Sequence, residues 1–285
     1  MKRMLVVCLL FVIFATNVFA QMSPRRRPVG DPTLVNGGTS VVSDPDVWDL
    51  LRVRMRANPP VDPARKAYPQ GAALVPASQL SIPPKAAKEF ERSQKAFQSG
   101  DWTSSTAHLQ KALHIYPDFI DAHNALGLRF LQTGQYDKAL AEHERAVAVD
   151  SHVAQTHEYL ALALLTLNRP QQSEAEARQS LDLDPQVPGS RYILARALIG
   201  QGQITPEAIG MLRQAEDAIP NASLVLAQIY FSAGKSDQVV EELRRYLKAP
   251  VDADNKQRAE CWVAQLSGES LPTGCPAGVT RPSFR

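Results

Sequence analysis

A leucine followed by a small residue recurs along this chain at a nearly constant interval. The pairs are Leu126-Gly127, Leu160-Ala161, Leu194-Ala195 and Leu226-Ala227, so that consecutive leucines lie 34, 34 and 32 residues apart. Turn-forming residues keep a similar interval, at Gly100, Gly134, Asn168, Gly202 and Gly234. A period of this length is typical of stacked structural repeats, in which each unit packs only against its neighbours. The period therefore predicts a function that depends on a surface built by several repeats, rather than on one catalytic cluster.

Between the turns, apolar residues follow the i, i+3, i+4, i+7 spacing of a helix with one buried face. We expect helix pairs at 84–98 with 101–115, 118–133 with 135–149, 152–167 with 170–183, 187–201 with 205–218 and 221–233 with 236–248, and a last helix at 252–266. The small residue of each pair, such as Gly127 or Ala161, leaves a hole for a large side chain, because packed helix axes are only about 8–10 Å apart. The pattern predicts an all-α solenoid of about five helix–turn–helix repeats, followed by a capping helix.

Residues 1–20 have the features of a secretory signal peptide. Lys2 and Arg3 precede an almost wholly apolar run, and Val18-Phe19-Ala20 places small residues at the −3 and −1 positions of a cleavage site. An uncleaved anchor is the alternative, although the run is shorter than the roughly 20 residues of a membrane span. We therefore expect an exported protein, periplasmic or secreted, with no membrane span after signal removal.

Residues 21–83 hold about half of the chain's 21 prolines, which predicts a largely disordered or extended segment. The stretch 46–56 differs, because Val47, Leu50, Leu51 and Met55 follow helical spacing beside Trp48. Two interpretations stay open for it. One is a transient helix in a tail, and the other is a helix that docks into a groove of this chain or of a partner.

Charge and cysteine content limit the possible partners and compartments. Removal of residues 1–20 leaves 29 basic and 29 acidic residues, and this balance argues against a nucleic-acid-binding protein. The same removal leaves two cysteines, Cys261 and Cys275. An even count in an exported chain is consistent with a disulfide, and two unrelated thiols are the alternative.

The repeat pattern resembles the tetratricopeptide repeat, a 34-residue helix–turn–helix unit. The second repeat matches best, with His123, Leu126-Gly127, Phe130, Gly134, Tyr136, Ala139 and Ala146 at the family's characteristic positions. It departs from the family at His123, where Trp is usual, and at Ser151, where Pro is usual. The resemblance covers about residues 84–250. Residues 251–267 resemble the capping helix of such arrays, and 268–285 form a C-terminal tail.

The resemblance implies that the first helices of the repeats line a concave groove that binds a peptide or a partner helix. The groove-facing residues would be Gln94, Phe97, Asn124, Leu128, Glu158, Leu162, Tyr192, Arg196, Gln228 and Phe231. They combine polar groups, aromatic rings and few charges. We expect a third to a half of them to pack against an adjacent repeat instead of contacting a partner.

Catalytic, cofactor and metal motifs are missing from the sequence. The six histidines show no His-Glu-x-x-His spacing, and His123 and His157 occupy a position where the family places an aromatic packing residue. We expect no enzymatic activity, no cofactor and no metal site. The sequence favours an exported, non-catalytic scaffold that binds a peptide or protein partner in its groove. The alternative is a structural accessory subunit of an envelope enzyme or assembly machine, contacting it through the N-terminal segment.

Overall fold

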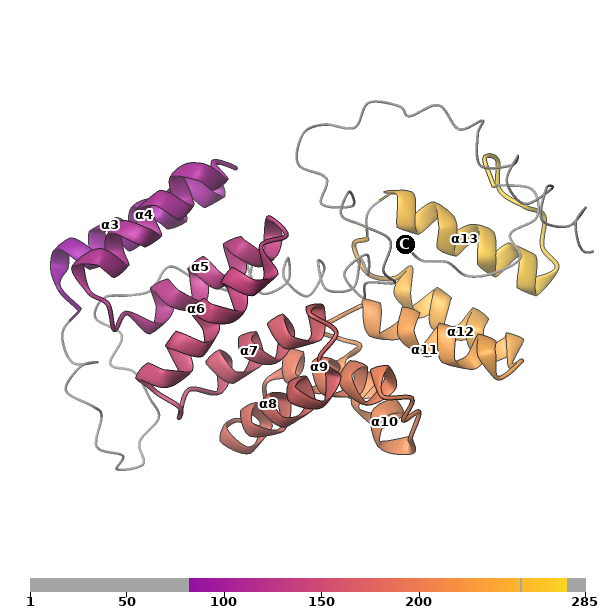
Figure 1. Ribbon diagram of the computed structural model, residues 1–285. Helices are drawn as coiled ribbons and strands as arrows, with labels where there is room; N and C mark the ends of the chain where they lie inside the picture. Colours follow the sequence, from indigo (N-terminus) through magenta and orange to yellow (C-terminus); the bar gives the residue numbers. More distant parts are fainter. Residues whose placement is uncertain (1–81, 252, 276–285) are drawn as a thin grey trace, which may run out of the picture. The chain divides into compact units, whose positions relative to one another are not determined.

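The computed structural model describes residues 82–251 and 253–275, which form helices joined by short turns (Figure 1). The helices, labelled as in Figure 1, are α3 (Pro84–Gln98), α4 (Trp102–Ile115), α5 (Ile120–Gln132), α6 (Tyr136–Val149), α7 (Ala154–Thr166), α8 (Pro170–Leu183), α9 (Pro188–Gly200), α10 (Pro206–Ala215), α11 (Asn221–Ser232), α12 (Ser236–Tyr246) and α13 (Ala253–Ser267). These two ranges contain no strand, and the all-α prediction is confirmed. The expected signal peptide, the helix at 46–56 and nearly all of the Pro-rich segment lie outside the described residues.

The helices pack in sequential pairs, which we number as repeats one to five: α3–α4, α5–α6, α7–α8, α9–α10 and α11–α12. The second helix of each repeat also contacts the first helix of the next repeat, and α13 packs on α12. In addition, α7 contacts both α5 and α9, so the first helices of repeats two to four lie side by side. Each repeat therefore shelters the apolar face of its neighbours, as the sequence period predicts.

The five expected turn residues adopt the left-handed backbone conformation. Their φ angles are 80° at Gly100, 73° at Gly134, 55° at Asn168, 78° at Gly202 and 70° at Gly234. The N–H of the following residue reaches back five residues, as from Asp101 to the carbonyl of Ala96 (2.8 Å). This bond satisfies a carbonyl at the end of the first helix, and glycine favours the turn because it has no Cβ to clash.

Helix bounds agree with the prediction to within three residues. The largest difference is at α10, which ends at Ala215 instead of residue 218. There the N–H of Ala218 bonds to the carbonyl of Ala215, three residues back (3.1 Å), so the chain tightens into a turn before Pro220.

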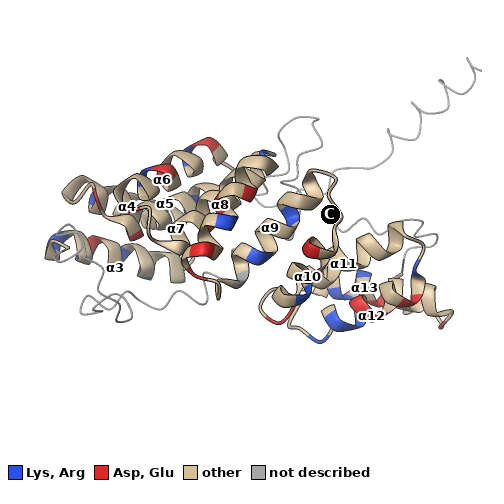
Figure 2. Ribbon diagram, turned by 90° about the horizontal axis from the view of Figure 1, so that it is seen from below, with Lys and Arg blue, Asp and Glu red and all other residues tan. Residues whose placement is uncertain are grey.

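The small residues of the repeat occupy buried helix crossings. Ala161, Ala195 and Ala227 are at most 2% exposed. At the equivalent Gly127, an added Cβ would lie only 2.5 Å from Cε1 of His143 on α6. The imidazole therefore fills the space that the glycine leaves, as the hole-and-knob prediction requires. Acidic and basic residues are interspersed along the helices (Figure 2).

Candidate functional site

The first helices carry the ten residues expected to face a groove, and the structure divides these residues into two sets. Asn124, Leu128, Glu158, Leu162 and Tyr192 are buried, with 1–5% of their surface exposed. Gln94, Phe97, Arg196 and Phe231 are half-buried, and Gln228 is exposed. Only the second set presents side-chain surface to a partner in this conformation. The first set keeps almost no accessible surface within the packed array.

The buried polar residues of the first set join neighbouring repeats. Nδ2 of Asn124 on α5 donates to Oγ1 of Thr156 on α7 (3.1 Å). Oδ1 of the same amide lies 3.4 Å from Nδ1 of His143 on α6. One amide therefore connects three helices, and its role here is to hold repeats two and three together.

Aromatic residues of the second set lie in the first and fifth repeats. The guanidinium carbon of Arg129 lies 3.5 Å from the centroid of the Phe97 ring, and Trp102 meets the same ring edge-on at 5.1 Å. In the fifth repeat, Phe231 contacts Trp262 of α13 in a T-shaped arrangement at 5.6 Å. Rigid aromatic rings of this kind are common anchors for protein partners, because their contact area costs little conformational entropy.

Two arginines on the first helices are partly desolvated. Nε of Arg129 donates to Oγ of Ser105 (3.3 Å), and an Arg196 guanidinium N–H donates to the Tyr192 hydroxyl (3.2 Å). Burial lowers the pKa of each arginine to about 10, so both remain charged at neutral pH. Arg129 is only 7% exposed, so of the two arginines Arg196 is the one that keeps accessible surface.

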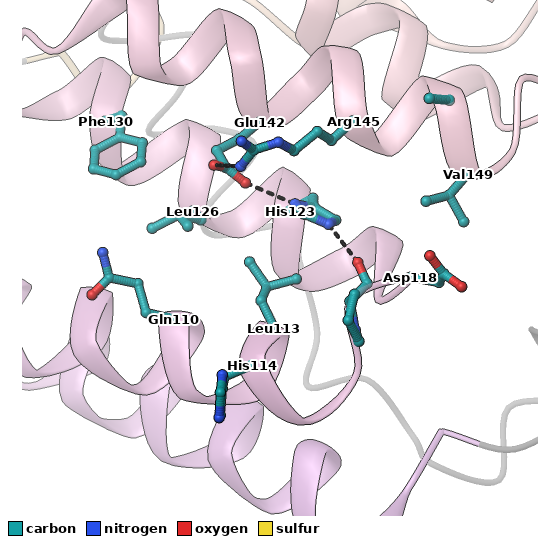
Figure 3. Close-up of a pocket in the computed structure, with 12 residues that line it drawn as sticks. Gln110, Leu113, His114, Asp118, His123, Leu126, Phe130, Glu142, Arg145 and Val149 are labelled. Atoms are coloured by element: carbon teal, nitrogen blue, oxygen red, sulfur yellow. Dashed lines mark hydrogen bonds and ion pairs between the residues drawn. The ribbon is translucent and has the colours of Figure 1, made fainter.

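A pocket of about 890 Å³ opens between α4, α5 and α6 (Figure 3). Its apolar lining includes Leu113 from α4, Leu126 and Phe130 from α5, and Val149 from α6. Polar side chains border it, namely Gln110, His114, Asp118, His123, Glu142 and Arg145. The pocket lies between the second helices of repeats one and two and contains none of the ten expected residues. It is large enough for two or three apolar side chains of a partner.

A chain of hydrogen bonds crosses the wall of this pocket. Nε2 of His123 is 2.7 Å from the carbonyl oxygen of Pro117, and Nδ1 is 2.7 Å from Oε2 of Glu142. Oε1 of Glu142 accepts from Arg145 (2.6 Å). These contacts fix the side chains of the wall. His123 is 6% exposed, in keeping with its expected structural role.

No motif in the sequence marks the pocket, because its size depends on the spacing between two second helices. One sequence signal does point to its wall. His123 and Glu142 lie 19 residues apart, and His157 and Glu176 repeat this pair one period later. A side-chain pair that recurs with the repeat period indicates a contact between the two helices of each repeat.

Cys261 and Cys275 form a disulfide, with their Cα atoms 5.7 Å apart. The bridge attaches the segment after α13 to the buried face of that helix, and it decides between the two alternatives that the sequence left open. Within residues 82–251 and 253–275, no group of three or more His, Cys, Asp or Glu side chains is placed to hold a metal ion. None of the helices in these ranges has the length and apolar content of a membrane span.

Comparison with known proteins identifies the repeat. A tetratricopeptide repeat family model matches residues 90–152 and 124–188. A search of curated proteins gives no match. Among solved structures, the chain is similar to PilW, described as a widely conserved type IV pilus biogenesis factor, with 20% identity, a TM-score of 0.57 and coverage of 66% of this chain and 88% of PilW.

Two further solved structures show the same fold. PilF of Pseudomonas aeruginosa has 16% identity and a TM-score of 0.55, with coverage of 65% of this chain and 85% of PilF. A thermophilic TPR protein of Thermus thermophilus, TTC0263, has 19% identity and a TM-score of 0.54, with coverage of 62% of this chain and 98% of that protein. The 34-residue sequence period, the sequential helix pairs and the family match agree, and the chain is a tetratricopeptide repeat protein.

Proposed function

We propose that this protein is an exported, non-catalytic scaffold that binds a peptide or protein partner along the first helices of its repeats. The observation that carries the proposal is the side-by-side packing of α5, α7 and α9, which aligns equivalent positions of successive repeats. Repeat arrays bind extended partners on such surfaces, since each repeat contributes one small set of contacts.

The proposed contact residues are the members of the expected set that keep exposed surface: Gln94, Phe97, Arg196, Gln228 and Phe231. The amides bind peptide backbone, the rings bind apolar side chains, and Arg196 binds an acidic group. Asn124, Leu128, Glu158, Leu162 and Tyr192 support the surface from below. A partner with apolar residues on both sides of an acidic one fits this chemistry.

Two observations support export. The bridge between Cys261 and Cys275 is of a kind that persists in oxidising compartments such as the periplasm. Residues 1–20 have the composition of a secretory signal. We therefore place the protein in the cell envelope or outside the cell, with a signal peptide at 1–20, a Pro-rich segment at 21–83, the array at 84–250, the capping helix at 251–267 and a tail at 268–285.

Site-specific photocrosslinking tests the proposed surface. A photoreactive amino acid placed at Gln228 or Gln94 should crosslink to a distinct protein in the native envelope, and mass spectrometry identifies that protein. The same probe at the exposed Gln172, on the second helix α8, is the matched control. Crosslinking of the same protein from Gln172 with equal yield would contradict binding on the first helices.

The alternative function is a structural accessory subunit of an envelope enzyme or assembly machine, contacted through residues 21–83. The fold shared with PilW, a pilus biogenesis factor by its description, favours an assembly role for this alternative. Deletion of residues 21–83 downstream of the signal separates the two functions. A partner that stays bound to the shortened chain supports the first-helix surface, and a partner that is lost supports the N-terminal segment.

A further inference from the structure

A carboxylate–imidazole pair connects the two helices of each of the first three repeats at equivalent positions. The pairs are Glu89–His108, His123–Glu142 and His157–Glu176, and in each one Nδ1 of the imidazole lies 2.7 Å from a carboxylate oxygen. The partners are 19 residues apart in every case. The second-helix member of the pair is therefore a fixed repeat position, with a polar partner across the repeat.

The hydrogen bonds define what this position requires in repeats two and three. Nε2 of His123 lies 2.7 Å from the carbonyl oxygen of Pro117, and Nε2 of His157 lies 2.9 Å from that of Ser151. A carbonyl oxygen only accepts, so Nε2 carries a proton in both residues. Nδ1 and the carboxylate oxygen of Glu142 or Glu176 are 2.7 Å apart, a hydrogen-bond distance, so one proton also lies between these two atoms. A glutamate at this position is stable in the core because a proton lies between it and its partner.

The fifth repeat keeps the glutamate and loses the imidazole. Glu242 of α12 takes the position of Glu142, and Ser223 of α11 takes the position of His123, again 19 residues apart. The Ser223 hydroxyl donates to Glu216 instead (3.4 Å). The Glu242 side chain has no exposed surface, and among the described residues neither of its carboxylate oxygens receives a hydrogen bond of good geometry.

Charged residues of α10 and α12 surround this carboxylate. An Arg213 nitrogen lies 2.5 Å from Oε1 of Glu242, and another lies 3.1 Å from Oε1 of Glu216. Oε2 of Glu216 is 3.1 Å from Arg245, which also pairs with Glu241 (2.6 Å). Two arginines therefore serve three carboxylates, and the most deeply buried of these carboxylates has the poorest hydrogen bonding.

Further polar contacts of α10 and α12 involve α11 and the segment after α13. The Tyr230 hydroxyl of α11 accepts a hydrogen bond from Arg213 (3.3 Å). Glu269, beyond α13, is 3.0 Å from Arg244 of α12. Burial and the nearby Glu216 raise the pKa of Glu242 to about 7, and Arg213 opposes the shift.

We propose that Glu242, with Arg213, Glu216 and Arg245, forms a proton-operated latch that joins the fourth and fifth repeats. With a proton on Glu242, the carboxylic acid donates to a neighbouring oxygen, and the side-chain link from Glu242 of α12 to Arg213 of α10 is kept. When the proton leaves, Glu242 is a buried carboxylate that competes with Glu216 for Arg213, and this link between the fourth and fifth repeats weakens. The orientation of the last repeat and of α13 relative to repeat four then depends on pH.

The pH window follows from the raised pKa of Glu242. The unfolded carboxyl titrates at 4.5 and the folded one at about 7, so the folded state keeps a proton that the unfolded state has released. The contribution of Glu242 to stability is therefore complete below pH 4.5 and is lost as the pH rises through 7. The latch is closed in acid and opens above neutrality.

Carboxyl-carbon NMR of the full mature chain tests the latch directly. The Glu242 side-chain signal should titrate with a midpoint near pH 7, and a midpoint at or below 5 would overturn the proposal. Amide exchange gives a second readout. Between pH 5.5 and 8.5, the protection factors of α12 amides should fall at least about tenfold in the wild type, as expected for more than one unit of pKa shift.

Glu242→Gln keeps the shape of the protonated acid and should abolish the fall in α12 protection factors between pH 5.5 and 8.5. Asp237→Asn, at an exposed carboxylate in the first turn of the same helix, should leave the fall intact and serves as the matched control. Equal pH dependence in the wild type and Glu242→Gln would overturn the latch. If Glu242→Gln does not fold, the NMR midpoint of the wild type decides. None of these measurements involves a partner, so a failure of the latch is distinct from a failure of the proposed binding function.

Discussion

At the scale of single residues, the repeat tolerates changes at a core position only where a neighbour compensates. The second helices place Leu109, His143, Ala177, Leu212 and Leu243 at equivalent sites, and all five are at most 1% exposed. His143 is the one residue of this series with an aromatic ring. Its imidazole faces Gly127, where the next three repeats have alanine. The two departures from the other repeats therefore make one packed pair.

Gly127→Ala should destabilise the protein by about 1–3 kcal/mol, because the new Cβ overlaps the His143 ring in a packed core. Gly210→Ala is the matched control. Gly210 also lies inside a helix, but nothing stands within 4 Å of an added Cβ. Its replacement should stabilise α10 by about 0.5–1 kcal/mol through helix propensity. Denaturant unfolding measures both changes, and equal effects would contradict the assigned contact.

His143→Leu should make the protein less sensitive to acid. Burial, with a smaller effect of His123, lowers the pKa of His143 from 6.5 to about 3. The unfolded state therefore binds a proton that the folded state does not, and stability is lost as the pH falls from 6.5 towards 3, on the order of a few kcal/mol. Leucine already fills this position in repeats one, four and five.

Glu242 changes stability in the opposite direction over part of the same pH range, so both proteins are compared in a Glu242→Gln background. We compare the free energy of unfolding at pH 6.5 with that at pH 4. The difference between the two values should be smaller in the His143→Leu protein than in the protein that keeps His143. An unchanged difference would mean that His143 is protonated in the folded state. The other carboxyl groups cancel in this comparison, since both proteins contain them.

At the scale of elements, the sequence period predicts the helices well because each helix repeats the same local requirements. Turn positions such as Gly134 need a left-handed backbone, and the buried stripe recurs every 34 residues. The end of α10 was harder to predict, because the repeat is irregular there and tight turn geometry replaces the last helical residues. Local rules fail where the period itself is broken.

The candidate surfaces were predictable to different degrees. The period correctly assigns Gln228 and Arg196 to first helices, but it does not predict how much of each side chain a neighbouring repeat covers. Asn124 is buried because Thr156 and His143 approach it from two other helices. The pocket beside His123 depends on the distance between α4 and α6, which no residue pattern encodes. Surfaces between repeats require the packed structure.

The disulfide gives a prediction for the last element. Replacement of Cys261 and Cys275 by serine should lower stability by about 3 kcal/mol, the value expected for a bridge that closes a loop of about 15 residues. The loss should be largest in α13, whose Trp262 packs against Phe231. Hydrogen exchange of the wild type and of the variant with both serines measures it. A uniform loss of protection across α3–α13 would instead indicate that the array unfolds as one unit.

At the scale of the whole array, stability depends on how many neighbours each helix has. The central helix α7 contacts α5, α6, α8 and α9, and every residue from Thr156 to Thr166 is buried. At the N-terminal end of the described array, α3 packs chiefly on α4 and buries only Ala86, Phe90 and Ser93. In a one-dimensional array, stability is close to a sum of repeat terms and nearest-neighbour interfaces. The terminal repeat therefore has one interface fewer to break than a central repeat.

Native-state hydrogen exchange should therefore show a gradient along the array. Amides of α7 should exchange only through the largest opening reaction, whereas those of α3 should exchange through a smaller, local opening. Each 1.4 kcal/mol of difference in opening free energy should lower the protection factors of α3 about tenfold relative to those of α7. As denaturant is added below the unfolding midpoint, the protection factors of α3 and α7 should converge. Global unfolding then becomes the main route of exchange for both helices. Ala161→Gly in α7 should reduce protection in α5, α7 and α9 but leave α3 almost unchanged. If the amides of α3 and α7 have equal protection factors without denaturant, the repeats unfold as a single cooperative unit. Nearest-neighbour coupling is then too strong for a bound partner or a proton to move one repeat alone.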